Sequence, residues 1–331
     1  MGVRRLPLNI GVDLGGTNIK FGLVTANGKI LCRINIPTLA KAGPNSVIAR
    51  IIETINHLRF SKGHRQTVRS IGIGSAGVID HCRGIIHYSP NLFGWKEIPL
   101  KERIEKETKI SVFVGNDANA FTLGEYCFGV GIGCHSLIGI TLGTGVGGGI
   151  IVDGKLLLGI NHAAGEVGHT SINAFGPKCR CGNLGCLERY VGAEYIVRQT
   201  IEQLKLPKAE QGLLQAENSV ILRLAKWDYK KITPEVIAQA GKKGDKLAKL
   251  KIKETGSYIG VGLANVVSLI DPEIIVIGGG VSGFGKLLLE TIRKTVSSRI
   301  MNYPGRKLKI FLSKLKDDAA ILGASQFERF L

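Results

Sequence analysis

Long apolar runs are absent from this sequence of 331 residues. A helix that crosses a bilayer needs about 20 consecutive, mainly apolar residues, and no stretch of the chain provides them. Residues 1–9 contain two arginines but no apolar core before a cleavage site, so no secretory signal is predicted. We therefore expect a soluble, cytoplasmic protein without a membrane partner.

Aromatic residues are scarce at 6%, and the 26 acidic residues are outnumbered by 44 lysines and arginines. A net charge of +18 is compatible with a nucleic-acid partner. However, the basic residues are spread out, and their densest run, residues 242–253, follows a lysine-rich helical pattern. Aromatic and basic residues do not alternate, so no platform for stacking bases is predicted. We interpret the charge as a solvated surface that attracts small anions, and we expect no nucleic-acid partner.

The seven cysteines are an odd number, which argues against a disulfide framework. Four are scattered and are interpreted as small buried side chains: Cys32, Cys82, Cys127 and Cys134. The other three lie within Cys179-Arg180-Cys181-Gly182-Asn183-Leu184-Gly185-Cys186, with His169 upstream. Three thiols and one imidazole suit tetrahedral zinc, and a reducing compartment disfavours disulfides. The C-x-C spacing is not the usual C-x-x-C, so the pattern alone is a moderate signal.

Glycine, by contrast, is abundant, and it gathers first in Asp13-Leu14-Gly15-Gly16-Thr17-Asn18. Apolar residues alternate with others after this stretch (Ile19, Phe21, Leu23), which predicts strand, turn, strand. Glycines let backbone N–H groups face an anion, Thr17 and Asn18 add donors, and Asp13 could hold hydrated Mg²⁺ beside phosphates. An ordinary hairpin turn fits this stretch equally well.

The same design recurs in Leu142-Gly143-Thr144-Gly145-Val146-Gly147-Gly148-Gly149, again between two apolar runs. Gly143, Gly145 and Gly148 match G-x-G-x-x-G, but a strand pattern follows where a dinucleotide site needs a helix. Two such hairpins predict a duplicated fold that holds a nucleotide between its halves. The chain is long enough for two domains.

Further candidate site residues follow predicted strands. A strand at residues 68–73 ends in Gly74-Ser75-Ala76-Gly77, and a loop with Asn91 precedes a predicted helix at 100–108. Asn116-Asp117 stands between a strand and a helix predicted at 118–128. Asn and Asp are favoured helix caps, so a capping role competes with a catalytic one.

These motifs together resemble the ROK sugar kinases, and among them most closely the glucokinase branch. The resemblance covers roughly residues 10–322. It implies an α/β actin-like ATPase (ribonuclease H-like) fold, duplicated, with two domains around a central cleft. The implied domains are residues 1–120, with a carboxyl-terminal helix at about 318–331 packing back on them, and residues 121–317, with a zinc-binding loop at 169–188.

The resemblance also implies roles for single residues. Asp117 is the implied catalytic base that accepts a proton from the sugar hydroxyl. The implied sugar-binding residues are Gly77, Asn91, Asn116, Asp117, Glu166, His169 and Glu188. The implied nucleotide-binding residues are Asp13, Gly15, Gly16, Thr17, Asn18, Lys20, Thr141, Gly143, Thr144, Gly145, Gly278, Gly279 and Gly280. The implied zinc ligands are His169, Cys179, Cys181 and Cys186. Ser75-Ala76 departs from the Gly-x-Pro-Gly common in the family, which weakens the sugar contact expected beside it.

The expected activity is ATP-dependent phosphorylation of a hexose at its 6-hydroxyl, with glucose giving glucose 6-phosphate. ATP, Mg²⁺ and a structural Zn²⁺ are the expected cofactors, and a homodimer or homotetramer is the expected assembly. A kinase for N-acetylmannosamine or another hexose is an alternative. A sugar-sensing repressor of the same family is a further one; we disfavour it because the first hairpin begins by Ile10 and leaves no room upstream for a helix-turn-helix module.

Several other elements are expected from periodicity. Helices are predicted at residues 45–58, 191–205, 235–240, 245–269, 286–298 and 318–330, and strands at 273–277 and 308–312. The order of elements in residues 206–231 is not predicted.

Overall fold

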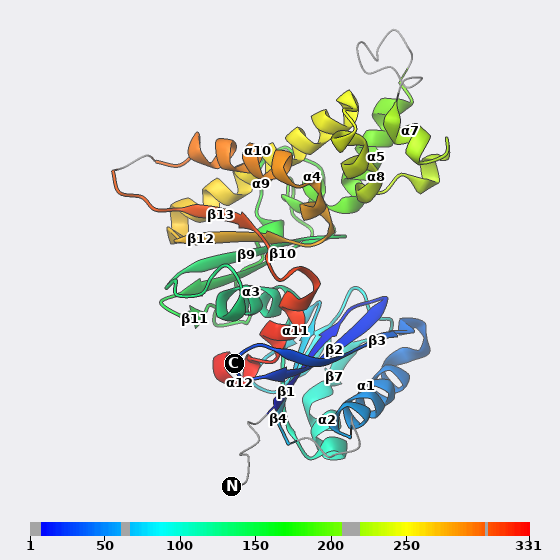
Figure 1. Cartoon of the computed structure of the whole chain (residues 1–331), viewed down its shortest axis with the longest axis vertical. Coiled ribbons are helices and arrows are strands. Elements are labelled where there is room, and N and C mark those ends of the chain that lie inside the picture. Colours follow the sequence, from blue (N-terminus) through cyan, green and yellow to red (C-terminus); the bar gives the residue numbers. More distant parts are fainter. Residues whose placement is uncertain (1–7, 61–66, 207–218, 302–303) are drawn as a thin grey trace. The chain divides into compact units, whose positions relative to one another are not determined.

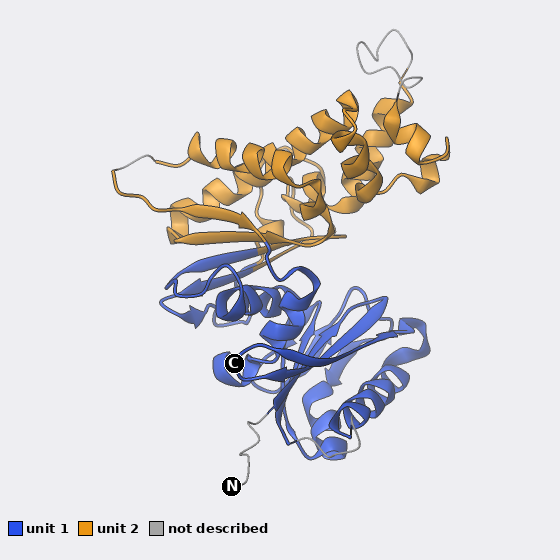
Figure 2. Ribbon diagram, viewed as in Figure 1, with its two compact units in different colours: residues 1–139, 149–165, 313–331 blue, residues 140–148, 166–312 orange. Residues whose placement is uncertain are grey.

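A computed structural model of the protein describes residues 8–60, 67–206, 219–301 and 304–331. Most of the stretch searched for a secretory signal, and residues 207–218, lie outside this part. The chain forms two compact units (Figure 2). Unit 1 comprises residues 1–139, 149–165 and 313–331, and unit 2 comprises 140–148 and 166–312. The sequence-based division at residue 120 differs from these limits and stays a prediction.

The first sheet has five strands in the order β3-β2-β1-β4-β8. Its strands are β1 (Leu8–Leu14), β2 (Asn18–Thr25), β3 (Ile30–Pro37), β4 (Val68–Ser75) and β8 (Ser111–Asn116). β1 runs antiparallel to β2 and parallel to β4, and β4 runs parallel to β8.

One face of this sheet is covered by α1 (Gly43–Arg59) and α2 (Leu100–Thr108) (Figure 1). Side chains alternate between the faces of a strand, so Ile10, Val12 and Leu14 share one face. They are fully buried in the core that includes α1 and α2. Both helices lie where the sequence predicted them.

The opposite face carries α11 (Ala319–Ala324), which lies on glycines. A Cβ atom at Gly11 or Gly72 would collide with the carbonyl oxygen of Ile321 or Ala324. Helix α3 (Asp117–Phe128) approaches α11 closely in the same way, since a Cβ at Gly124 would meet the Ala319 oxygen. The predicted carboxyl-terminal helix is divided, because α12 (Phe327–Phe330) follows Ser325 and Gln326 as a separate turn of helix.

A three-stranded antiparallel sheet, β5-β6-β7, also belongs to unit 1 and was not predicted. Its strands are β5 (Val78–Asp80), β6 (Ile85–Tyr88) and β7 (Lys96–Pro99). These strands are only three or four residues long, too short to show a clear alternating pattern. β5 and β6 connect the end of β4 to the loop with Asn91, and β7 follows that loop.

The second large sheet has the order β11-β10-β9-β12-β13. Its strands are β9 (Leu137–Leu142), β10 (Val146–Val152), β11 (Lys155–Leu156), β12 (Ile274–Gly278) and β13 (Lys309–Leu312). β10 is antiparallel to β11 and β12 is parallel to β13. The hairpin at one end and the parallel pair at the other repeat the pattern of the first sheet, as the duplicated hairpins predicted.

The helices of unit 2 are α4 (Glu188–Val191), α5 (Ala193–Leu204), α7 (Val220–Leu224), α8 (Pro234–Lys242), α9 (Lys246–Ile270) and α10 (Lys286–Ser297). Helix α9 packs closely on α10, because Gly256 and Gly260 admit Thr291 and Thr295. The predicted helix at 191–205 starts later, since Gly192 is extended and separates α4 from α5. Among the described residues, no helix is both long and apolar enough to span a bilayer.

Candidate functional site

The carboxyl ends of three neighbouring strands bring the site residues of unit 1 together. Leu14 of β1 is in register with Ser75 of β4, and Ser75 with Asn116 of β8. Ligands of such sheets bind at this edge. Asp13 is the register partner of Gly74, and a Cβ at Gly74 would lie 3.6 Å from the Asp117 Cα atom. The metal-binding and catalytic candidates therefore share one edge of one sheet.

The first glycine turn is held by hydrogen bonds within the turn and from Thr38. The Gly15 N–H donates to the Asn18 carbonyl at 3.1 Å, which closes the turn. Thr38 stabilises it further, because its hydroxyl donates to the Gly15 carbonyl at 2.6 Å and its N–H to the Thr17 carbonyl at 2.8 Å. Sequence reasoning missed Thr38, since its place depends on the pairing of β2 with β3.

Gly16 lies directly against the loop expected to bind sugar. A Cβ atom at Gly16 would lie 2.8 Å from the Asn91 carbonyl oxygen and 3.0 Å from the Asn91 Cβ. An open pocket of about 1050 Å³ adjoins both residues and is lined by Thr17, by Pro37, by residues 39–42 and by 88–94. Its volume is ample for a hexose.

Gly77 has a structural reason to be glycine. Its φ of 124° lies in a region that other residues rarely adopt, and a Cβ there would collide with the Tyr88 carbonyl oxygen. This close approach holds the β4–β5 connection against the segment that leads to Asn91. A contact of Gly77 with sugar stays a prediction.

Asp13 lies in an unusual electrostatic setting. Burial raises the pKa of its carboxyl group, Lys20 lowers it, and Asp317 raises it. Lys20 is the cross-strand register partner of Asp13, and its Nζ atom lies 3.8 Å from an Asp317 carboxylate oxygen. A mainly buried carboxylate at the edge of a glycine turn is a hard oxygen donor of the kind that Mg²⁺ prefers.

Asn116 fills the capping role that the sequence left open, and the catalytic role of Asp117 stays a prediction. The Asn116 Oδ1 atom caps α3, accepting from the N–H groups of Ala118 at 2.8 Å and Asn119 at 3.3 Å. Asp117 is the first residue of the helix, and its Oδ1 atom accepts from the Ala118 N–H at 2.9 Å. An ionised carboxylate offers about four acceptor positions, so this bond leaves capacity for a substrate hydroxyl.

The second glycine turn, in unit 2, is held by Glu188. The Gly143 N–H donates to the Gly145 carbonyl at 2.9 Å, and the Val146 N–H donates to a Glu188 carboxylate oxygen at 3.1 Å. A Cβ at Gly145 would collide with that oxygen, whereas one at Gly143 would meet no atom within 4 Å. Glu188 thus supports the turn directly. A sugar hydroxyl would have to bind at an acceptor position of the Glu188 carboxylate other than the one used by the Val146 N–H, and this contact stays a prediction.

The third glycine cluster lies beside this turn. Gly279 has a φ of 83°, and a Cβ on it would collide with the Leu142 carbonyl oxygen. A Cβ at Gly280 would have only the Glu235 carboxylate nearby, at 3.8 Å. The structure therefore places two groups of predicted nucleotide-binding residues together, Thr141 to Gly145 and Gly278 to Gly280.

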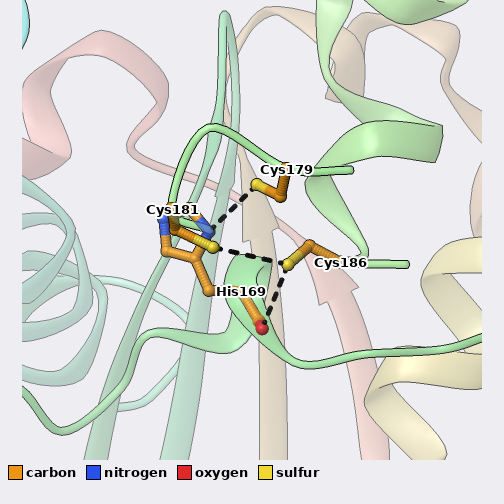
Figure 3. Close-up of side chains that lie close together, drawn as sticks. All are labelled: His169, Cys179, Cys181 and Cys186. Carbon is orange, nitrogen blue, oxygen red and sulfur yellow. Dashed lines mark hydrogen bonds between the residues drawn. The ribbon is translucent and has the colours of Figure 1, made fainter. Parts of the chain in front are cut away.

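The predicted zinc ligands converge, as their four donor atoms lie within 4.8 Å of one another (Figure 3). The Cys179 sulfur lies 3.7 Å from the His169 Nδ1 atom, and the Cys181 and Cys186 sulfurs are 3.6 Å apart. A tetrahedral zinc ion with Zn–S bonds of about 2.3 Å separates its donors by about 3.5–3.8 Å. The arrangement fits this ion.

The thiols of this group differ in acidity. Burial and the neighbouring thiols raise the pKa of Cys186 to about 12, whereas a hydrogen bond with the Asn183 backbone lowers that of Cys181. Because a metal binds the thiolate, its affinity for such a set depends on pH.

The predicted residues fall into two sets. Unit 1 holds Asp13 to Lys20, Gly77, Asn91, Asn116 and Asp117, and unit 2 holds the remaining predicted residues of the site. Glu166 is exposed at the start of a short helical turn, Val167–His169, that leads to the first zinc ligand.

Comparison with known proteins identifies relatives of this chain. The model of the ROK family matches residues 9–329. A glucokinase of Thermotoga maritima is 38% identical over 316 residues, covering 96% of this chain and 95% of the relative. A xylose repressor of Caldicellulosiruptor bescii is also 38% identical, covering 95% of this chain and 76% of the repressor.

Solved structures are similar to this chain as well. The crystal structure of a ROK family glucokinase from Streptomyces griseus, in complex with glucose and AMPPNP, superposes with a TM-score of 0.80. It is 35% identical, and the match covers 96% of this chain and 98% of that one. The α/β actin-like ATPase fold expected from the sequence is thereby confirmed. With a family model that matches nearly the whole chain, relatives of similar length and the same fold, the chain belongs to the ROK family.

Proposed function

We propose that this chain transfers the γ-phosphoryl group of ATP to the 6-hydroxyl of a hexose, and that glucose is its main substrate. The observation that carries the proposal is that Asp13 and Asp117 share one sheet edge, while Gly16, in the turn after β1, lies against Asn91. The Streptomyces griseus relative, with glucose and an ATP analogue bound, supports glucose as the acceptor.

Asp117 would accept the proton of the sugar hydroxyl as that oxygen attacks phosphorus. Asn116 fixes the first turn of α3 through its cap, and so it holds the Asp117 backbone in place. Asn91 lies against the first glycine turn, where its amide would bind a sugar hydroxyl close to the phosphates. Catalysis would then come from positioning and charge neutralisation rather than from a covalent intermediate.

Backbone N–H groups of the two glycine turns would bind the phosphates, and Gly278 to Gly280 would receive the nucleoside. Asp13 would hold Mg²⁺ through its hydration shell, and that ion would neutralise charge on the phosphate oxygens. Lys20, beside Asp13, would contribute a second positive charge to the same region.

The Cys₃His set would hold a structural Zn²⁺, since four protein ligands leave no open position. These residues join the turn that contains Glu166 and His169 to the start of α4, where Glu188 stands. The ion would therefore fix three predicted sugar-binding residues in one loop. A homodimer or homotetramer in the cytoplasm, where ATP is available, completes the proposal.

The test is an ADP-release assay with glucose, mannose, fructose, N-acetylglucosamine and N-acetylmannosamine, with ATP alone as the blank. We expect the highest kcat/KM with glucose. A clear preference for N-acetylmannosamine would replace glucose as the substrate within the same mechanism. Absence of turnover with every sugar, together with sugar-dependent DNA binding, would favour a regulator like the xylose repressor.

A further inference from the structure

A second group of metal-ligand side chains lies in unit 1, apart from the Cys₃His set. Asp80, Cys82 and His162 each offer a donor atom, and these atoms lie within 4.8 Å of one another. Asp80 ends β5, Cys82 is exposed in the turn that follows, and His162 belongs to the loop after β11. None of the three residues has a role in the proposed reaction.

His162 is held in a way that suits a ligand. Its Nδ1 atom is buried and, within the described residues, has no hydrogen-bond partner. Its ring packs edge to face on His81 at 5.2 Å between ring centroids. The His81 ring is itself buried, and its Nδ1–H donates to the Val114 carbonyl at 3.2 Å. A buried ring nitrogen without a partner is costly, and a metal ion would satisfy it.

Asp80 is a charged ligand that is partly engaged. Its two oxygens accept from the Arg83 N–H at 2.9 Å and from the Arg83 Nε at 2.6 Å. These bonds hold its pKa at about 2, so the carboxylate is ionised at all working pH values. The Arg83 side chain is 66% exposed and can turn away into solvent, although its charge opposes a cation.

We propose that Asp80, Cys82 and His162 form an open binding site for a divalent transition-metal ion such as Zn²⁺ or Co²⁺. The site joins the β5–β6 turn to the loop after β11. A thiolate, an imidazole and a carboxylate favour these ions over Mg²⁺ or Ca²⁺. Three protein ligands leave a fourth position for water. Donors around a tetrahedral ion lie about 3.3–3.8 Å apart, so both surface segments need to close only slightly.

The experiment measures Zn²⁺ bound per chain by equilibrium dialysis and metal analysis of the full-length protein. We expect Cys82→Ser and His162→Gln each to bind one equivalent fewer than the wild type. Cys32→Ser, which removes a thiol outside the cluster, is the matched control and keeps the wild-type number. The Cys₃His set is the same in the variants and the wild type, so a difference of one zinc equivalent reports on the new site alone. The test therefore holds even if the Cys₃His set binds no zinc.

A second measurement follows Co²⁺ binding through the thiolate-to-metal absorption band. We expect Asp80→Asn to weaken the cobalt site at least about tenfold, because loss of even an outer partner of a ligand costs that much. Arg83→Met should strengthen it, since it releases the carboxylate and removes a positive charge. Equal stoichiometry in wild type and Cys82→Ser, or an unchanged cobalt affinity in Asp80→Asn and Arg83→Met, would overturn the proposal. Thermal unfolding of each variant verifies that the fold is intact.

Discussion

At the scale of single residues, the hydrogen bonds of Asn116 and Asp117 are the most informative feature. Two adjacent polar residues stand at the amino end of α3, and either could cap a helix. The structure gives two capping bonds to Asn116 and one local bond to Asp117. The cap thus rests mainly on Asn116, and a catalytic role for Asp117 stays a prediction.

Asp117→Asn removes the proton acceptor and keeps the shape of the side chain. We expect kcat for glucose to fall by a factor of about 10²–10⁴, with little change in ATP binding or melting temperature. Steady-state kinetics and nucleotide titration measure these effects. Asn116→Ala is a comparison variant: it should cost about 1 kcal/mol of stability through the lost cap and, because Asn116 is an implied sugar-binding residue, raise the KM for glucose. Near-normal turnover of Asp117→Asn would remove Asp117 from the mechanism.

The two charged neighbours of Asp13 shift its pKa in opposite directions, so their removal should shift the pH dependence of activity in opposite directions. If Mg²⁺ needs ionised Asp13, kcat/KM for ATP falls on the acid side at the pKa of this group, which burial raises. Lys20→Met removes a charge that lowers that pKa, so the acid limb should move to higher pH. Asp317→Asn removes a charge that raises it, so the limb should move to lower pH. Shifts in the same direction, or none in either variant, would contradict the assignment.

At the scale of elements, helix α11 is packed on the first sheet through glycine rather than through interlocking side chains. Gly11 of β1 and Gly72 of β4 face its carbonyl oxygens, and Gly124 of α3 does the same from another direction. The helix thereby supports the backs of both strands that end beside Asp13 and Ser75. A larger side chain at any of these glycines would collide with backbone atoms, which cannot rotate away as a flexible side chain can.

Gly72→Ala should therefore destabilise the protein by about 1–3 kcal/mol, the usual range for overpacking. Urea unfolding measures the change. Gly283→Ala is the control, since a Cβ at Gly283 meets no atom within 4 Å, and it should stay near wild-type stability. Equal stability of the two variants would show that α11 can move aside.

The zinc loop is the second element whose role can be tested. Cys181→Ser, or removal of zinc by a chelator, should raise the KM for glucose several-fold before the melting temperature of the chain falls. Cys181 is exposed, so the substitution leaves no core cavity. Cys127→Ser is the control: burial raises the pKa of that thiol to about 11, and it lies outside the set. An unchanged KM for glucose in zinc-free protein would contradict the role of the loop.

At the scale of the whole molecule, the net charge of +18 raises the question of DNA binding. The 38% identical xylose repressor shows that a closely similar chain occurs within a repressor. Charge alone gives non-specific DNA binding, which depends on counterion release. Regulation requires sequence-specific binding that sugar modifies.

We expect any DNA binding by this chain to be non-specific and to fall steeply with salt. For about 6–10 phosphate contacts, the affinity should drop by about 10³–10⁵ between 50 and 200 mM salt. Fluorescence anisotropy with two unrelated duplexes measures it, with and without glucose. Binding that persists at physiological salt, prefers one duplex and responds to glucose would instead indicate a regulator.

Features that depend on neighbours along the chain could be predicted from the sequence. Alternation around Gly15-Gly16 predicted the first hairpin, now seen as β1 and β2, and the second hairpin predicted the repeated sheet pattern. The strand–helix junction at Asn116-Asp117 was also predicted from the sequence. Such signals are local because a strand, a tight turn and a helix cap each involve residues a few positions apart.

Contacts between segments that are distant in the sequence became visible with the three-dimensional fold. Gly16 lies against Asn91, Glu188 closes the turn at Gly145, and Asp317 lies beside Lys20. His162 likewise lies beside Asp80. No local pattern encodes these contacts, because each depends on the register of strands and the packing of helices that are far apart in the chain. Burial then sets properties such as the pKa of Asp13, which composition and spacing leave open.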